Sequence, residues 1–246
     1  MGVEPFKIDS ERGKFTAEIK GKALDAGATL VGIVSANAID SLPPIWVGWT
    51  IKEYTKKTTD LMPDAKSVIV IGYHIWDDVL EIALRKDDDW VYPCYSPLWD
   101  IPLRISHHLE TKGYEAVSTS SLSKKRLAQL AGFGAYGKNA LIINPKYGPW
   151  IRLGSLVTNA ELVPDQPFEQ DLCGDCDNCL KVCPAGALTP YKVDDSKCLV
   201  RIHLSGSAEE IDKNKGLLRR FEPSLTQNAH LMCMECQKVC KYGKRT

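Results

Sequence analysis

The sequence between residues 173 and 184 reads Cys-Gly-Asp-Cys-Asp-Asn-Cys-Leu-Lys-Val-Cys-Pro, which is a C-x₂-C-x₂-C-x₃-C-P run. This spacing is typical of the ligands of [4Fe–4S] clusters. Three cysteines at steps of three can surround one cluster from a short loop, whereas the fourth reaches a different cluster. The run therefore predicts two clusters, and it requires further cysteines elsewhere in the chain.

The C-terminal part of the chain contains the missing cysteines. Cys198 stands alone, and residues 233–240 read Cys-Met-Glu-Cys-Gln-Lys-Val-Cys, a C-x₂-C-x₃-C run without its first cysteine. Because paired runs exchange their last ligand, Cys198 can take the missing place. Cys94 is then left over. The predicted ligands are Cys173, Cys176, Cys179 and Cys240 for cluster I, and Cys183, Cys198, Cys233 and Cys236 for cluster II.

Two other uses of the cysteines compete with this interpretation. Zinc also binds four cysteines, but the x₂, x₂, x₃, Pro pattern favours clusters. A disulfide framework is disfavoured in a chain of 246 residues that has no secretion signal. The ligands also need reduced thiols, and no apolar stretch is long enough to span a bilayer. We therefore expect a cytoplasmic protein that does not contact a membrane.

Composition excludes little else. Hydrophobic residues make up 44% and charged residues 25% of the chain, as in ordinary globular proteins. The formal net charge is zero, so no overall basic field attracts nucleic acid.

The part of the chain before the cysteine runs alternates helical and strand patterns, which predicts an α/β layer domain. The continuous apolar run at residues 67–73 indicates a strand in a sheet that is covered on both faces. We expect this domain over residues 1–160, a linker over 161–170 and a cluster domain with a helical insertion over 171–246. The expected helices and strands are 14–26, 29–35, 67–73, 102–111, 115–118, 123–131, 140–143, 151–158 and 208–220.

A glycine-rich segment reads Gly-Phe-Gly-Ala-Tyr-Gly-Lys-Asn at residues 132–139. A dinucleotide-binding G-x-G-x-x-G needs a strand before it and a helix after it. Here a helix is expected before and a strand after, which disfavours that site. Two interpretations stay open: a tight connection that needs positive φ, or backbone that approaches a flat ligand closely.

Residues 130–145, read as Leu-Ala-Gly-Phe-Gly-Ala-Tyr-Gly-Lys-Asn-Ala-Leu-Ile-Ile-Asn-Pro, resemble the signature of epoxyqueuosine reductases, together with Gly148 and Leu153-Gly154. The cysteine runs resemble the same family, and the likeness extends from about residue 67 to 240. Epoxyqueuosine reductases and reductive dehalogenases share a corrinoid domain and a two-cluster domain. The resemblance implies an α/β (α+β) N-terminal domain of the corrinoid-binding, nitroreductase-like type, followed by a bacterial ferredoxin-like 2×[4Fe–4S] domain. It also implies bound cobalamin.

The resemblance further implies site residues. Asp100 matches the family's proton donor over the corrin, Cys94 matches a cysteine upstream of it, and Tyr95 is a second candidate donor. Burial among aromatic residues would raise the pKa of Asp100, as a general acid requires. The alternatives are a helix N-terminal acid for Asp100 and a small buried hydrophobe for Cys94. The residues implied to contact cobalamin are Gly132, Gly134, Tyr136, Gly137, Lys138, Asn139 and Gly154.

The implied function is a cobalamin-dependent reductase in which a ferredoxin- or flavodoxin-type donor feeds two clusters, whose potentials reach about −700 mV. The sequence departs from the family in four places, one of which is the region before Asp100, where the usual basic run is missing. Residues 134–137 read Gly-Ala-Tyr-Gly instead of Gly-Trp-Ile-Gly, Lys241 replaces a proline, and the chain ends six residues after Cys240. The family commonly continues there into a segment that helps to hold tRNA, so we expect a small-molecule substrate. The alternatives are an electron-transfer or corrinoid-reducing protein without its own substrate, and a short epoxyqueuosine reductase acting on tRNA.

Overall fold

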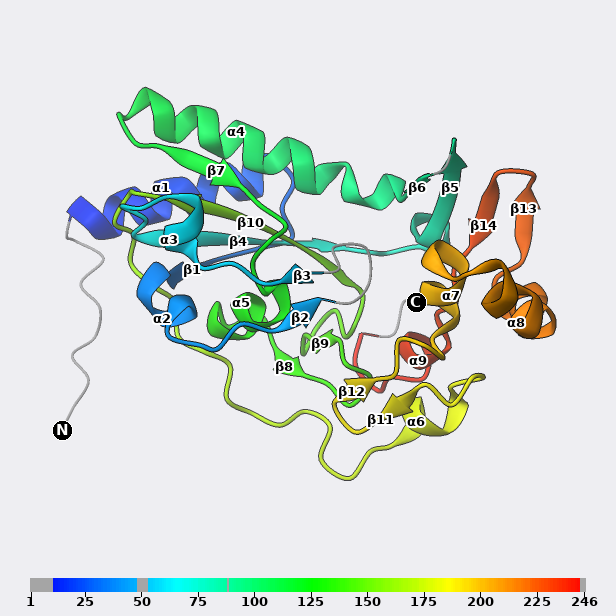
Figure 1. Ribbon diagram of the computed structural model, residues 1–246. Helices are drawn as coiled ribbons and strands as arrows, with labels where there is room; N and C mark the ends of the chain where they lie inside the picture. Colours follow the sequence, from blue (N-terminus) through cyan, green and yellow to red (C-terminus); the bar gives the residue numbers. More distant parts are fainter. Residues whose placement is uncertain (1–10, 48–52, 88, 244–246) are drawn as a thin grey trace.

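The computed structural model describes residues 11–47, 53–87 and 89–243. Its central sheet has the strand order β1-β4-β10-β7 and is antiparallel throughout (Figure 1). The strands are β1 (Leu30–Ser35), β4 (Ser67–His74), β7 (Ala116–Ser118) and β10 (Ile151–Thr158). Residues 67–72 of β4 are all buried, which confirms that this strand is covered on both faces.

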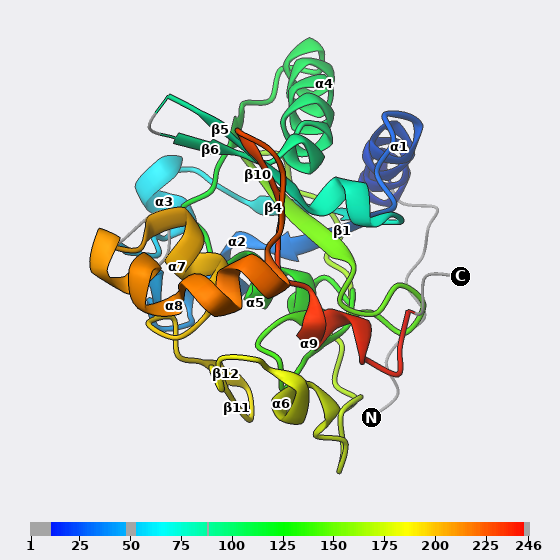
Figure 2. The ribbon, with the colours of Figure 1, turned by 90° about the vertical axis from the view of Figure 1, so that its right-hand side faces the viewer.

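Helices cover the two faces of this sheet (Figure 2). Ile69 and Ile71 of β4 pack with α1 (Glu11–Asp25) and α4 (Pro97–Thr111). Val68 and Val70 point the other way, because successive side chains of a strand alternate. They pack with α2 (Ala36–Asp40) and α5 (Lys124–Leu130). The predicted layer arrangement is therefore confirmed in outline.

Helix α4 differs from the expectation. It begins at Pro97, not at residue 102, and Pro102 lies inside it. Proline suits the first helical position because its fixed φ matches the helix and its missing N–H would have no intrahelical partner there. Asp100 consequently lies in the first turn of α4 and not in a loop that precedes the helix.

A second sheet was not expected from the sequence. It has the order β13-β14-β5-β6 and joins a hairpin from the first part of the chain to a hairpin from the cluster region. Its strands are β5 (Ile82–Lys86), β6 (Asp89–Val91), β13 (Ser224–Thr226) and β14 (Ala229–Leu231). Charged residues stand where these two strands of the first hairpin end and begin, at Lys86 and Asp89, and such residues alone do not identify a hairpin.

The expected linker follows the surface of the central sheet. Leu162 N–H donates to Ser67 Oγ at 3.0 Å, and the Asp165 carboxylate accepts from Ile33 N–H at 2.7 Å and from Lys20 Nζ at 2.6 Å. These bonds fix the chain as it leaves β10 for the cysteine-rich region.

The helical insertion expected at 208–220 is present as α8 (Ala208–Phe221). Its first turn is closed by a capping box between Ser207 and Glu210. Among the described residues, no helix has the length and apolarity that crossing a bilayer requires. The other elements are β2 (Trp46–Val47), β3 (Glu53–Tyr54), α3 (Thr58–Leu61), η1 (Asp78–Glu81), η2 (Pro93–Tyr95), β8 (Ala135–Tyr136), β9 (Ile142–Ile143), α6 (Asn178–Val182), β11 (Leu188–Thr189), β12 (Lys192–Val193), α7 (Leu199–Ser205) and α9 (Glu235–Lys238).

Candidate metal centres and a neighbouring pocket

The four cysteines predicted for cluster I line one cavity, although Cys240 comes from a distant part of the chain. Burial, followed by the neighbouring thiols of Cys173 and Cys176 and by that of Cys240, raises the pKa of Cys179. The predicted ligand set is therefore brought together by the fold.

The predicted ligands of cluster II are also neighbours. Burial raises the pKa of Cys236, and the next contributions come from Cys233, Cys198, Cys183 and Cys179. The influence of Cys179, a cluster I cysteine, indicates that the two sets adjoin. Ala187 N–H donates to Cys183 Sγ at 3.3 Å. Such hydrogen bonds to ligand sulfur are one of the features that set cluster potentials.

The arrangement of the thiols bears on the zinc alternative. Zinc binds sulfur at about 2.3 Å, so four zinc-bound thiolates converge on one point. The cluster I thiols surround a cavity instead, as a multi-iron cubane with cysteine ligands requires. The donor sets thus fit two [4Fe–4S] clusters.

The glycine-rich segment has the expected context, because α5 precedes it and the strand β9 follows, while β8 lies inside the segment. A Cβ on Gly134 would lie 2.1 Å from the carbonyl oxygen of Ile143, and one on Gly137 would lie 2.6 Å from Ile143 Cγ1. Gly132 has φ +75°, a region that glycine enters without strain. The protein's own backbone packing therefore accounts for these glycines.

The two residues after the glycines contact the cluster-binding loops. Lys138 N–H donates to Cys173 Sγ at 3.4 Å, and Lys138 Nζ donates to Gly174 O at 2.5 Å. Asn139 Nδ2 donates to Cys236 O at 3.4 Å. The segment thus joins the central domain to the loops of both clusters.

The two remaining residues that were implied to contact cobalamin also have protein neighbours. Tyr136 has the Lys125 ammonium 5.9 Å from its ring centroid. Gly154 lies under α4, where its Cβ would be 3.4 Å from Leu98 Cδ2.

The three predicted catalytic residues do not form one group. The Asp100 side chain is 53% exposed and pairs with Arg104 at 2.7 Å. Cys94 and Tyr95, in contrast, pack in a cluster with Trp150 and Met234. Burial raises the pKa values of both the Cys94 thiol and the Tyr95 phenol. Their catalytic roles stay predictions.

Arg152 is the charged partner of this buried cluster. Its guanidinium lies 6.0 Å from the Tyr95 ring centroid and forms a buried ion pair with Glu81. Both residues were missed from the sequence, where neither stands in a recognisable motif.

A pocket of about 470 Å³ lies between α2, α5 and the segment that follows β3. Its charged lining has three cations, Lys56, Lys57 and Arg126, against one carboxylate, Asp60, and this positive balance suits an anionic ligand. No sequence motif pointed to it, although the adjacent pair Lys56-Lys57 was a possible signal. Its lining residues are Ile39, Leu42, Pro43, Pro44, Tyr54, Thr55, Lys56, Lys57, Asp60, Ser123 and Arg126.

Helix α5 connects this pocket to cluster II. Lys125 is partly buried, and Lys125 Nζ donates to Ala140 O at 2.6 Å. Burial lowers the pKa of Lys125, and the charge of the Cys198 thiolate opposes that effect. The next residue, Arg126, lines the pocket. Adjacent residues of α5 therefore line the pocket and respond to the charge of a cluster II ligand.

The fold and the cysteine sets define a two-cluster iron–sulfur protein, and residues 172–243 match the family model described as a 4Fe-4S double cluster binding domain. Over a larger part of the chain, the sequence is related to epoxyqueuosine reductases. The enzyme of Listeria monocytogenes is 38% identical over 128 residues, 52% of this chain and 31% of that protein. The enzyme of Bacillus cereus is 27% identical over 244 residues, 89% of this chain and 62% of that protein.

Solved structures confirm the fold. A crystal structure of epoxyqueuosine reductase with an epoxyqueuosine-modified tRNA-Tyr stem loop has a TM-score of 0.67 and 22% identity, and covers 93% of this chain and 65% of that one. A reductive dehalogenase structure described as suggesting a mechanism for B12-dependent dehalogenation has a TM-score of 0.54 and 20% identity, and covers 80% of this chain and 30% of that one. The resemblance inferred from the sequence is thereby confirmed. The chain spans less than two thirds of the length of each of these four relatives.

Proposed function

We propose that this chain is an iron–sulfur oxidoreductase that reduces the epoxide of an epoxyqueuosine-type nucleoside in tRNA. The observation that carries the proposal is the position of α5. The charge of the cluster II ligand Cys198 acts on Lys125, and Arg126 lies on the wall of a pocket of ligand size. An electron source and a substrate-sized pocket therefore flank the same helix. The names of the sequence relatives supply the substrate class.

The electron count of this reaction suits two clusters. Reduction of an epoxide to an alkene consumes two electrons and two protons and releases one water. Two [4Fe–4S] clusters, held by the two sets of four cysteines, would supply one electron each, which together make the pair that one turnover needs. A low-potential donor of the ferredoxin or flavodoxin type would refill them.

The pocket has the chemistry that an RNA ligand needs. Lys56, Lys57 and Arg126 can pair with phosphates, which supply most of the salt-dependent affinity for nucleic acid. Tyr54 can stack on an unpaired base. Because the formal net charge of the chain is zero, these cations are a local feature. The tRNA alternative is therefore better supported than the small-molecule substrate that we expected from the sequence.

Cobalamin was implied by the resemblance, and its contacts with the seven residues named for it stay a prediction. None of these seven residues lines the 470 Å³ pocket. A Cβ on Gly134 or Gly137 would meet Ile143, and Lys138 and Asn139 contact the loops of both clusters. If cobalamin is a cofactor, adding it anaerobically to the protein will shift the visible spectrum of cobalamin. The shift will be complete at a stoichiometric ratio of cobalamin to protein.

A second candidate function is electron transfer to a partner protein without a substrate of this chain's own. The separation of exposed Asp100 from buried Cys94 and Tyr95 favours it, because no proton donor among these three faces the pocket.

One assay separates the two functions. Anaerobically reconstituted protein, reduced by dithionite, is incubated with tRNA from a strain that accumulates epoxyqueuosine. The proposal predicts that the modified nucleoside loses one oxygen atom, as measured by mass spectrometry, and that Lys57→Ala lowers the yield while Arg104→Ala does not. An unchanged nucleoside with both clusters reduced would contradict the proposal and leave electron transfer.

A further inference from the structure

Glu222 is a buried carboxylate that contacts the ligand loop of cluster II. It lies at the end of α8 and is 2% exposed. One carboxylate oxygen, Oε1, accepts a hydrogen bond from the backbone N–H of Cys233 at 3.1 Å. The other, Oε2, lies 2.6 Å from Nδ1 of His203. A single side chain therefore bridges a predicted cluster ligand and an imidazole.

The helical insertion between Cys198 and Cys233 builds this bridge. Helix α7 starts directly after Cys198 and carries His203 in its last turn. Helix α8 then returns the chain, so that Glu222 comes back beside the cluster that Cys198 ligates. Both residues of the hydrogen-bonded pair, His203 and Glu222, therefore belong to the insertion.

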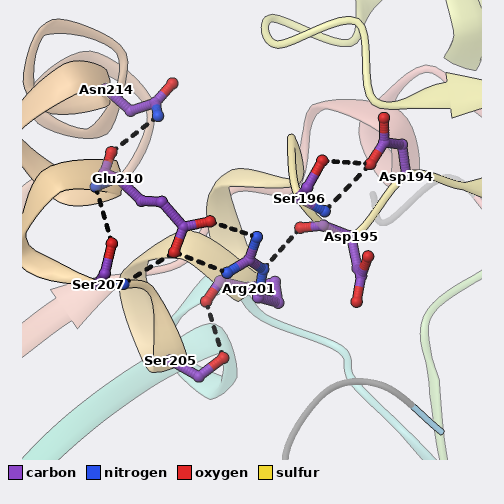
Figure 3. Close-up of polar contacts among 8 residues, drawn as sticks. All are labelled: Asp194, Asp195, Ser196, Arg201, Ser205, Ser207, Glu210 and Asn214. Atoms are coloured by element: carbon purple, nitrogen blue, oxygen red, sulfur yellow. Dashed lines mark hydrogen bonds and ion pairs between the residues drawn. The ribbon is translucent and has the colours of Figure 1, made fainter.

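Arg201 fixes the start of the returning helix (Figure 3). Its two terminal nitrogens donate to the Glu210 carboxylate at 2.7 and 3.2 Å, and its Nε donates to Asp195 O at 2.7 Å. Such bidentate pairs are geometrically specific. They hold α8 against α7, which sets the position at which Glu222 arrives.

Aromatic rings enclose the outer side of the bridge. The ring of Trp90 meets that of His203 edge-on at 4.9 Å, and the ring of His230 does so at 4.4 Å. Trp90 belongs to β6 and His230 to β14, so the unexpected second sheet supplies this cover. Because water is excluded on this side, a charge on Glu222 is poorly screened.

Glu222 lies close enough to act on cluster II, because its Oε1 accepts a hydrogen bond from the backbone N–H of the ligand Cys233 at 3.1 Å. Adding an electron to a cluster adds one negative charge, and a fixed carboxylate nearby opposes it. Net charge and hydrogen bonding are among the levers that set cluster potentials.

We propose that Glu222, held in place by His203, is a positioning residue that lowers the reduction potential of cluster II. Reduced cluster II, on the side of the molecule that faces α5 and the pocket, would thereby be a stronger reductant. The inference needs the two clusters but does not depend on reduction of tRNA.

The test is an anaerobic redox titration followed by electron paramagnetic resonance on protein with both clusters loaded. Glu222→Gln removes the charge and keeps an oxygen that can accept from Cys233 N–H. We expect one of the two clusters to become at least tenfold easier to reduce, a shift of about +59 mV for one electron. The other cluster should change less than twofold. Glu209→Gln makes the same replacement at an exposed position of α8, and both potentials should stay at the wild-type values.

A third variant, Glu222→Asp, separates loss of the charge from a general disturbance of the site. It keeps the charge, and the proposal predicts that its cluster II stays within threefold of the wild-type reduction equilibrium. Unchanged potentials in Glu222→Gln, an equal shift in Glu209→Gln, or a tenfold shift in Glu222→Asp would each overturn the proposal. Failure of the wild-type protein to reduce tRNA, together with the expected potential shift in Glu222→Gln, would count against the proposed function alone.

Discussion

The backbone N–H of Lys138 donates to Sγ of Cys173 at 3.4 Å. This contact joins the glycine-rich segment of the central domain to the first ligand of cluster I. Its neighbour Asn139 reaches the carbonyl of the cluster II ligand Cys236. The sequence signature that resembles epoxyqueuosine reductases therefore lies where the two parts of the molecule meet.

Gly134→Ala should destabilise the protein because its Cβ would meet the Ile143 carbonyl at 2.1 Å. The backbone must shift to relieve this contact, and such overpacking costs roughly 1–3 kcal/mol. Gly216→Ala is the matched control, since it meets nothing within 4 Å in α8 and should stabilise by about 0.4–1 kcal/mol. Anaerobic urea unfolding measures both. Equal stability of the two variants would show that the glycine at residue 134 serves something other than this hairpin.

Lys57→Ala should weaken binding of an epoxyqueuosine-containing tRNA stem loop. Lys57 is exposed and lines the pocket, so its loss removes one phosphate contact without disturbing the core. The slope of log K against log salt should fall by about 1. Arg104→Ala lies outside the pocket and should leave affinity and slope as they are. If both variants lose affinity equally, the RNA binds elsewhere.

Asp100→Asn should preserve turnover and both clusters. The Asp100 carboxylate is half-exposed and paired with Arg104 in the first turn of α4, so the variant loses mainly an interaction with the helix dipole, worth about 0.3–1 kcal/mol. Single-turnover assays and thermal unfolding check this. Complete loss of turnover with intact clusters would instead establish Asp100 as the proton donor that the family resemblance implies.

Glu210→Gln should lower stability by the same amount throughout pH 6 to 8. The hydrogen bond from Arg201 is the main cause that lowers the pKa of Glu210 from 4.5 to about 2. Because the folded pKa is the lower one, the contribution is complete above pH 4.5 and is lost only as the pH falls towards 2. Unfolding midpoints of both proteins at several pH values give the difference. A difference that shrinks between pH 8 and 6 would contradict this assignment.

Local patterns predicted the elements whose residues carry their own signals. The cysteine spacing gave both ligand sets, and apolar periodicity gave β1, β4, β10 and α1. The second sheet was missed because β5 and β6 are short, carry charges at their turn and pair with a hairpin from residues 224–231. Such pairing depends on distant residues, which no local window contains.

The residues of the candidate site could likewise be predicted only where a local sequence pattern marks them. Single residues such as Cys176 were predicted because their spacing encodes chemistry. Glu222 and Arg126 were not, since each acquires its role from residues far away in the sequence: Cys233 and His203 for Glu222, and the lining of the pocket for Arg126. Asp100 was misplaced because the start of α4 depends on Pro97 and not on the aromatic residues around it.

The central claim is that eight cysteines from two separate segments hold two cubanes with exchanged ligands. Iron and acid-labile sulfide are counted in anaerobically reconstituted protein, together with the Cys240→Ser variant. The account predicts about eight irons and eight sulfides per chain in the wild type. It predicts loss of one cluster signal, with the other retained, in the variant. Bound zinc, or about four irons per wild-type chain, would contradict it.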